Sequence, residues 1–215
     1  MTVKQPSVLL FDWDNTLVDG WAGITAALNA TFHAFGHPAW TVEDTRTRVR
    51  VSLRESFPQM FGPRWEEARD IFYDTLSREH LAHVSPMPGM ADVLEAGMHW
   101  PQGVVSNKAG PFLRREVTHL DWDRFFGPVI GAGDAAADKP APDPILLALS
   151  RIGRGADKSV WYMGDTALDM RAAKAAGVTA VLVGNAEHDG GVEQAAADIH
   201  FPSGFALQAR LRELA

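Results

Sequence analysis

Two aspartates, Asp12 and Asp14, follow the apolar run 7–11 with one residue between them. Side chains alternate between faces along an extended backbone, so the two carboxylates face the same way. Trp13 then faces the opposite way, and we expect it to pack into the core. No lysine or arginine stands beside the pair in the sequence. Two unpaired anions at the end of a buried strand are costly, so the pair indicates a site that a cation completes.

The elements that must position these carboxylates form an alternating pattern. Short β-branched and apolar runs predict buried strands at 7–11, 103–106, 127–132, 159–164 and 179–184, with a weaker one at 198–203. Helical patterns separate them at 90–99, 111–120, 144–152, 168–176 and 191–197. Such alternation is typical of βαβ units, so we predict an α/β fold with a doubly wound, Rossmann-like parallel sheet.

One segment interrupts the alternation between the first strand and the rest of the sheet. Residues 21–83 contain no convincing strand, and their patterns predict three helices at 22–35, 42–60 and 65–83. We therefore predict an α/β core domain of residues 1–18 and 86–215, with an all-helical cap domain of residues 19–85 inserted in it. Ligands bind beyond the carboxyl ends of the strands in doubly wound sheets, so we expect the cap to act as a lid there.

Polar side chains follow the other predicted strands as well. They are Ser106, Asn107, Lys108, Asp138, Lys139, Asp165, Thr166 and Asp169. The carboxyl ends of parallel strands meet at one edge of a sheet, so we expect most of these side chains to converge with Asp12 and Asp14. We expect Lys108, in contrast, to be a solvated surface residue.

These residues resemble the motifs of the haloacid dehalogenase superfamily, and in particular its phosphoglycolate-phosphatase-like group with a helical cap. Four motifs match in order: D-W-D-N-T at 12–16, Ser106 with Asn107, Lys139 in K-P-A-P-D, and G-D-T-A-L-D at 164–169. A lone D-x-D is a weak signal. Four ordered motifs at strand ends, with an insert where the cap belongs, are a specific one.

The resemblance implies a Mg²⁺-dependent phosphatase that acts on a small phosphorylated metabolite through an aspartyl-phosphate. It implies that Asp12 is the nucleophile. It also implies that Asp14 protonates the leaving oxygen and then deprotonates the hydrolytic water. Mg²⁺ prefers oxygen ligands. The implied ligands are the carboxylates of Asp12 and Asp165, the backbone carbonyl of Asp14, and Asp169 directly or through water.

The same resemblance assigns the remaining motif residues to the phosphate. Ser106 and the backbone around Asn107 would donate hydrogen bonds to the phosphoryl oxygens, and Lys139 would add a positive charge. We count Ser106 and Lys139 among the catalytic residues for this reason. Thr16 is expected to fix the turn after the first strand.

Substrate choice is expected to depend on the cap, which carries no recognisable motif. Arg50 and Arg54 are candidates for binding a carboxylate or a distal phosphate of the substrate. Phosphoglycolate is a substrate suggested only by the family group. The sequence predicts neither the substrate's identity nor the oligomeric state.

Two other functions fit the motifs. A phosphomutase of the same superfamily would keep Asp14 but shield the aspartyl-phosphate from water. A non-catalytic phospho-switch would combine a similar acidic site, hydroxyl and lysine, although the inserted cap and the second aspartate argue against it. A dehalogenase is disfavoured, because those relatives lack the acidic residue that corresponds to Asp14.

Composition narrows the class of protein further. The net charge of −7 argues against non-specific binding to nucleic acid or to an anionic membrane. The chain has no cysteine, which excludes disulfides, thiolate metal sites and cysteine nucleophiles. The sequence shows neither an apolar run of ~20 residues nor a signal-peptide pattern, so we expect a soluble, cytoplasmic protein.

Overall fold

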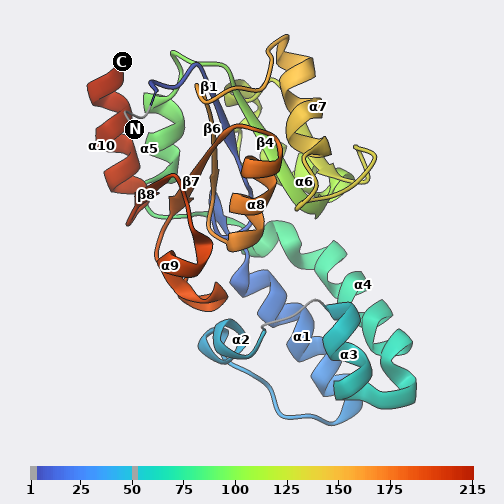
Figure 1. The fold of residues 1–215 in the computed structure, drawn as a ribbon. Coiled ribbons are helices and arrows are strands. Elements are labelled where there is room, and N and C mark those ends of the chain that lie inside the picture. Colours follow the sequence, from blue (N-terminus) through green and yellow to red (C-terminus); the bar gives the residue numbers. More distant parts are fainter. Residues whose placement is uncertain (1–3, 50–52) are drawn as a thin grey trace. The chain divides into compact units, whose positions relative to one another are not determined.

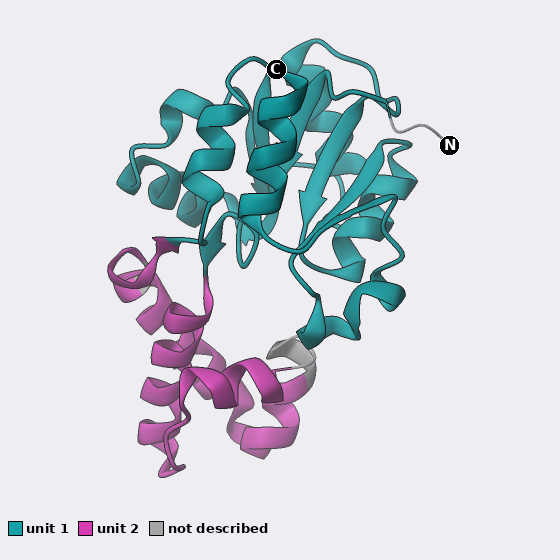
Figure 2. Ribbon diagram, turned by 90° about the vertical axis from the view of Figure 1, so that its left-hand side faces the viewer, with its two compact units in different colours: residues 1–19, 86–215 teal, residues 20–85 magenta. Residues whose placement is uncertain are grey.

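The computed structural model describes residues 4–49 and 53–215. The chain divides into two compact units, coloured separately in Figure 2. The first unit comprises Met1–Asp19 and Pro86–Ala215, and the second comprises Gly20–Ser85. Each unit has its own hydrophobic core.

Among the described residues, six parallel strands form the sheet of the first unit, in the order β5-β4-β1-β6-β7-β8 (Figure 1). The strands are β1 (Val8–Phe11), β4 (Gln102–Ala109), β5 (Val129–Ala132), β6 (Val160–Gly164), β7 (Thr179–Val183) and β8 (Ile199–Phe201). Phe11 of β1 pairs with Val104 of β4 on one side and with Met163 of β6 on the other. The strand order reverses beside β1, which confirms the predicted doubly wound α/β fold.

Helices cover both faces of this sheet. They are α5 (Met90–Ala96), α6 (Gly110–His119), α7 (Asp143–Ile152), α8 (Ala167–Ala175), α9 (Gly191–Ala195) and α10 (Gly204–Leu214), with short 3-10 helices η2 (Asp123–Phe125) and η3 (Glu187–Asp189). Val8 and Leu10 of β1 pack in one core cluster with residues of α7 and α8. Leu9 faces the opposite way, where a Cβ on Gly97, just after α5, would lie 2.9 Å from its Cδ1. Alternate residues of one strand thus anchor two helical layers.

The last helix, α10, was not among the predicted elements. Ser203 caps its start, because the Ser203 Oγ accepts a hydrogen bond from the backbone N–H of Ala206. α10 lies beside α5 (Figure 1). A Cβ on Gly204 would lie 2.7 Å from the Met90 Sδ, so a glycine lets the two helices approach closely.

The second unit is helical. It contains α1 (Trp21–Phe35), α2 (Val42–Arg48), α3 (Leu53–Phe61), η1 (Gly62–Arg64) and α4 (Trp65–His83). The short strands β2 (Val18–Asp19) and β3 (Ser85–Pro86) lie where the chain passes from one unit to the other, and they pair with each other. Its core is mainly aromatic and includes Phe32, Phe57, Phe61 and Phe72.

The helix predicted over 42–60 is wrong in one respect, because α2 ends at Arg48 and α3 begins at Leu53. Thr41 and Asp44 form a capping box at the start of α2, which fixes this short helix locally. Val49 is extended, with φ −78° and ψ 97°, so the helical hydrogen-bond pattern cannot continue through it.

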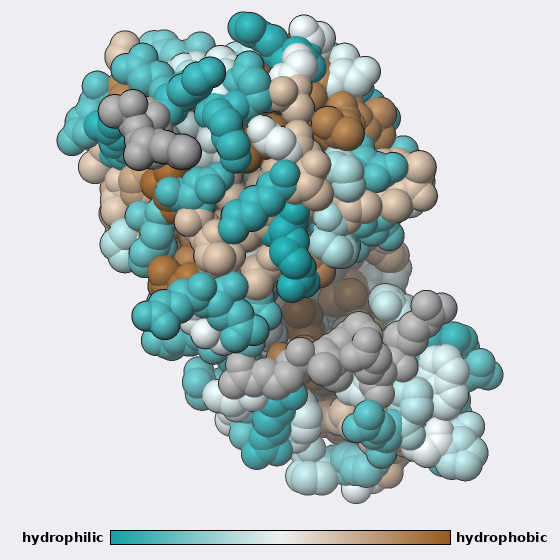
Figure 3. Space-filling view, viewed as in Figure 1, coloured by the Kyte–Doolittle hydropathy of each residue, from teal (hydrophilic) through white to brown (hydrophobic). Residues whose placement is uncertain are grey.

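The visible face of both units is a mixture of hydrophilic and apolar residues (Figure 3). This mixture is consistent with the 22% of charged residues in the chain. No helix within residues 4–49 and 53–215 is long and apolar enough to cross a membrane.

Candidate active site

Asp12 is the first residue after β1, at the carboxyl end of the strand beside the reversal of the sheet. Its backbone N–H donates to the carbonyl of Met163 on β6, with 2.8 Å between the two atoms. The chain then turns sharply, and Asn15 has φ 62°, in the left-handed region that asparagine tolerates. The turn keeps Asp12 and Asp14 at the edge of the sheet where doubly wound folds bind ligands.

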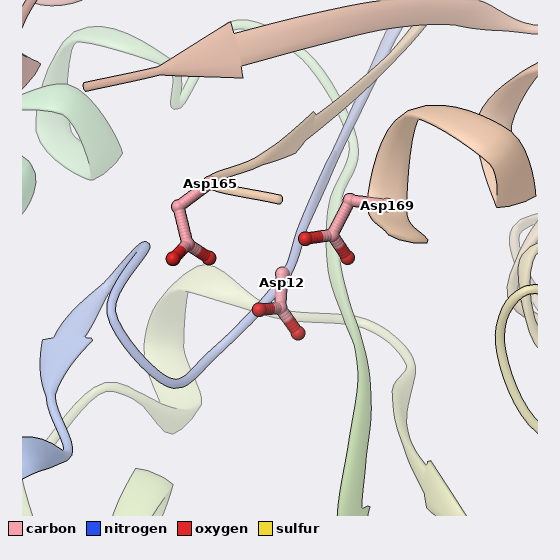
Figure 4. A group of neighbouring side chains, drawn as sticks. All are labelled: Asp12, Asp165 and Asp169. Atoms are coloured by element: carbon pink, nitrogen blue, oxygen red, sulfur yellow. The ribbon is translucent and has the colours of Figure 1, made fainter. Parts of the chain in front are cut away.

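Three buried carboxylates lie together at this edge (Figure 4). One oxygen from each of Asp12, Asp165 and Asp169 lies within 4.8 Å of the others. Asp165 follows β6, and Asp169 lies in the first turn of α8. Gly164 makes this spacing possible, because a Cβ there would lie 2.3 Å from the Cβ of Asp169. The site is therefore built from the ends of neighbouring strands and one helix start.

Lys139 supplies the positive charge among these carboxylates. Its Nζ lies 2.6 Å from Asp12 Oδ1 and 2.7 Å from Asp169 Oδ1, and the side chain is almost fully buried. It also donates to the hydroxyl of Tyr162 at 2.9 Å. The side-chain amide of Asn107 fixes the backbone of Lys139 from both sides, since it donates to the Lys139 carbonyl at 2.9 Å and accepts from its N–H at 3.0 Å.

The other oxygens of the group differ in what they contact. Asp169 Oδ2 accepts from the backbone N–H and the hydroxyl of Thr166, so both oxygens of Asp169 are engaged. Asp165 Oδ1 accepts from the hydroxyl of Thr16 at 3.0 Å. Asp165 Oδ2 is buried without an aligned hydrogen bond, although His188 Nε2 lies 3.1 Å from it. Asp165 therefore retains an oxygen that can coordinate a cation.

Burial shifts the protonation equilibria of this group. Burial raises the pKa of Asp12 to about 8, with Asp169 and Asp165 adding to the rise and Lys139 opposing it. Burial also raises the pKa of Asp165, against the opposing contact with His188. Burial by itself would lower the pKa of Lys139, but Asp12 and Asp169 outweigh it and hold that pKa well above its usual value. Lys139 is therefore cationic, yet this single cation does not keep the pKa of Asp12 or of Asp165 at its usual value.

Asp14 contacts a different lysine. Lys108 Nζ lies 2.8 Å from Asp14 Oδ1 and 2.7 Å from Glu116 Oε2. The Lys108 side chain is only 15% exposed, so the expectation of a solvated surface residue is wrong. The two carboxylates make it a bridging cation, and they raise its pKa although burial alone would lower it. Trp13 is fully buried, and its Nε1–H donates to the same Glu116 oxygen at 2.6 Å.

Residues 9–183 match the family of haloacid dehalogenase-like hydrolases. The chain belongs to this family. A phosphoglycolate phosphatase of Xanthomonas campestris pv. campestris (strain 8004) is 30% identical over 187 residues, covering 83% of each chain. A phosphoglycolate phosphatase of Shigella boydii serotype 4 is 31% identical over 201 residues, covering 80% of this chain and 78% of the relative.

Solved structures agree with this hydrolase in fold. A haloacid dehalogenase-like family protein from Streptococcus pneumoniae has a TM-score of 0.81 at 22% identity, with 95% of this chain and 98% of the other covered. A subfamily IA hydrolase from Geobacter sulfurreducens has a TM-score of 0.79 at 21% identity, with 96% of each covered. The predicted superfamily and enzyme class, a phosphatase of the haloacid dehalogenase type, are confirmed.

Three residues of this haloacid dehalogenase-like hydrolase lie at the site although the sequence analysis assigned them no role there. His188, in η3, contacts Asp165. Tyr162 contacts Lys139, and Glu116 contacts Lys108. A signal existed for His188, because it follows β7, and residues beyond the carboxyl ends of strands share one edge of the sheet. Tyr162 and Glu116 lie within a strand and a helix, where the sequence gives no comparable sign.

Among the other predicted site residues, the structure describes the side chains of Ser106 and Asn107 but not those of Arg50 and Arg54. Ser106 is buried near the end of β4, and its Oγ accepts from the backbone N–H of Lys108 at 3.1 Å. The side chain of Asn107 is engaged with the backbone of Lys139. Arg50 lies outside the described residues. Arg54 belongs to α3, and its side chain is not among those described.

Proposed function

We propose that this hydrolase removes the phosphate from a small phosphorylated metabolite and that Asp12 carries the phosphoryl group between two steps. The observation that carries the proposal is the contact of the buried Asp12 carboxylate with Lys139 at 2.6 Å, beside Asp165 and Asp169. A buried carboxylate with a fixed cation next to it can attack phosphorus while the cation contacts the phosphoryl oxygens. We also propose that residues 19–85 form the cap domain of this hydrolase.

The donor set fits Mg²⁺. The group offers only oxygen ligands, which this ion prefers, and one buried oxygen of Asp165 has no aligned hydrogen bond. Asp12, Asp165 and the carbonyl of Asp14 would hold the ion. Asp169 would assist through water, because both of its oxygens already accept hydrogen bonds. When bound, Mg²⁺ would neutralise charge on the phosphoryl oxygens and reduce their repulsion of the nucleophile.

Two displacements account for the reaction. In the first, an oxygen of Asp12 forms a bond to phosphorus and the bond from phosphorus to the leaving oxygen breaks, while Asp14 gives a proton to that oxygen. In the second, Asp14 removes a proton from water, the water oxygen attacks phosphorus, and the bond to Asp12 breaks. The products are an alcohol and inorganic phosphate, and Asp12 and Asp14 return to their initial states. Lys139, Ser106 and the backbone of Asn107 would contact the phosphoryl oxygens throughout.

The substrate is proposed to be a small phosphate ester, with phosphoglycolate as the first compound to test. The support is the name of relatives that are 30% and 31% identical over most of this chain. Arg50 and Arg54 remain candidates for binding a carboxylate of such a substrate. Exchange of either for alanine is expected to raise the KM for phosphoglycolate more than the KM for an alkyl phosphate that lacks a carboxylate.

A phosphomutase is the second candidate, because it would use the same Asp12 and Asp14. The two functions differ in the fate of the aspartyl-phosphate, which a phosphatase passes to water and a mutase returns to a sugar. Incubation with phosphosugars and with simple phosphate esters, in Mg²⁺ and in EDTA, distinguishes them. Free phosphate supports the phosphatase, and isomerised phosphosugar without free phosphate supports the mutase. A long-lived phosphoprotein without turnover supports a phospho-switch.

A further inference from the structure

Glu116 is a buried carboxylate that the proposed reaction does not use. It lies in α6, and its side chain is 1% exposed. Its Oε2 accepts from the Trp13 Nε1–H at 2.6 Å and lies 2.7 Å from Lys108 Nζ. A buried carboxylate is costly unless hydrogen bonds and a cation compensate it, and Glu116 has both.

Both partners of Glu116 are connected to the loop after β1: Trp13 belongs to it, and Lys108 contacts Asp14 in it. Trp13 immediately precedes Asp14, so its hydrogen bond to Glu116 fixes the backbone on that side. Lys108 Nζ contacts Asp14 Oδ1 at 2.8 Å, so it fixes the carboxylate itself. One buried side chain thus holds Asp14 at two points, its backbone and its side chain.

Asp12 and Asp14 each contact a different lysine. Lys139, after β5, contacts Asp12, and Lys108, on β4, contacts Asp14. Lys108 also lies two residues after Ser106 and donates its backbone N–H to the Ser106 Oγ. Lys108 is therefore tied to a residue on the phosphate side of the site as well as to Asp14. A lysine that served only to neutralise Glu116 would need neither contact.

We propose that Glu116 and Lys108 are positioning residues for Asp14, and that they hold its carboxylate where it exchanges a proton with the leaving oxygen and with water. The inference rests on the proposed function, since it assigns the pair to one step of that reaction. Neither residue is proposed to touch the substrate. Glu116 acts through Lys108 and Trp13, and Lys108 acts through Asp14.

A positioning role for the proton donor has a distinctive consequence. The leaving group of an alkyl phosphate is a basic alkoxide, which needs a proton. The leaving group of p-nitrophenyl phosphate is a weakly basic phenolate, which hardly needs one. Loss of the pair should therefore lower kcat/KM for the alkyl ester much more than for the aryl ester, because kcat/KM reports the first displacement and the second displacement is the same for both esters. A general loosening of the fold would slow both.

The test compares kcat/KM, which reports the first displacement, for glycerol phosphate and p-nitrophenyl phosphate in the wild type, Lys108→Met, Lys108→Arg and Glu116→Gln, with Asp14→Asn as reference. For Lys108→Met we expect a ~100-fold loss on glycerol phosphate and less than a ~5-fold loss on the aryl ester, following the usual size of acid catalysis. Lys108→Arg should regain most of the lost rate. Glu116→Gln keeps an oxygen for Trp13, and it should show the same preference with a smaller loss. If Lys108→Met does not fold, Glu116→Gln alone can still test the proposal.

Each outcome has a defined meaning. A selective loss on the alkyl ester in Lys108→Met and Glu116→Gln, like that of Asp14→Asn, supports the pair's role. Equal losses on both esters, or none, while Asp14→Asn is selective, overturn the inference and leave the proposed function standing. Hydrolysis of no small phosphate ester, phosphoglycolate included, by the folded, Mg²⁺-supplied wild type overturns both.

Discussion

Lys139 Nζ lies 2.6 Å from Asp12 Oδ1, although the two residues are 127 positions apart in the chain. The contact exists because β1 and the segment after β5 end at the same edge of the parallel sheet. It joins the first and third motifs of the sequence into one site, which a turn or a helix cap after β1 would not do.

Lys139→Met should remove this cation and leave Asp12 and Asp169 facing each other. We expect phosphate release to fall by at least ~100-fold, the usual cost of losing a charge-stabilising donor. The free energy of unfolding should fall by ~3–5 kcal/mol, because one partner of a buried ion pair is lost. Arg210→Met is the control, since its ion pair with Glu213 is exposed and should change stability by less than ~1 kcal/mol. Denaturant unfolding and a phosphate assay measure both effects.

Gly164→Ala should displace Asp169, because the new Cβ would lie 2.3 Å from the Asp169 Cβ. We expect a destabilisation of ~1–3 kcal/mol, as for overpacking in general. Activity should fall with it, since Asp169 also contacts Lys139. Gly155→Ala is the control, because no atom lies within 4 Å of a Cβ there and its backbone is not left-handed. Similar stability in the two variants would contradict this account of Gly164.

His188→Gln should weaken Mg²⁺ binding, because His188 contacts the candidate metal ligand Asp165. Loss of a group that orients a ligand typically costs ~10-fold or more in metal affinity. The rise in Tm on titration with Mg²⁺ measures affinity without any substrate. His119→Gln, at an exposed position in α6, should leave the titration unchanged. An unchanged affinity in His188→Gln would mean that the contact with Asp165 does not orient a ligand.

Mg²⁺ binding should release protons near neutral pH. The pKa of Asp12 is raised to about 8, so below that pH much of its carboxyl is protonated, and a cation must displace the proton. As the pH rises past about 8, Asp12 is already ionised and the release should decline. Calorimetry at pH 7 and pH 9, each in two buffers of different ionisation enthalpy, measures it. A release that is absent at pH 7, or that grows towards pH 9, would contradict the raised pKa.

The core fold could be predicted because apolar runs that alternate with helical patterns are a local signal. The strands of the folded sheet, and its α-helices except α10, lie where these patterns predict them. Asp12, Asp165, Asp169 and Lys139 also lie together as their places after strands indicate. The break in the helix predicted over 42–60 was missed, because propensity continues through Val49 while its backbone is extended. The bridge from Lys108 to Glu116 and Asp14 was missed for a different reason. Asp14 lies 94 residues from Lys108, and only the folded sheet shows that Lys108 turns inward.

We propose that Asp12 is the nucleophile of a Mg²⁺-dependent phosphatase. The most direct measurement is phosphate release from a panel of small esters that includes phosphoglycolate, with Mg²⁺ and with EDTA, for the wild type and Asp12→Asn. We expect turnover that requires Mg²⁺ and is lost in Asp12→Asn while the protein remains folded. Turnover that survives Asp12→Asn, or no turnover by folded wild type supplied with Mg²⁺, would contradict it.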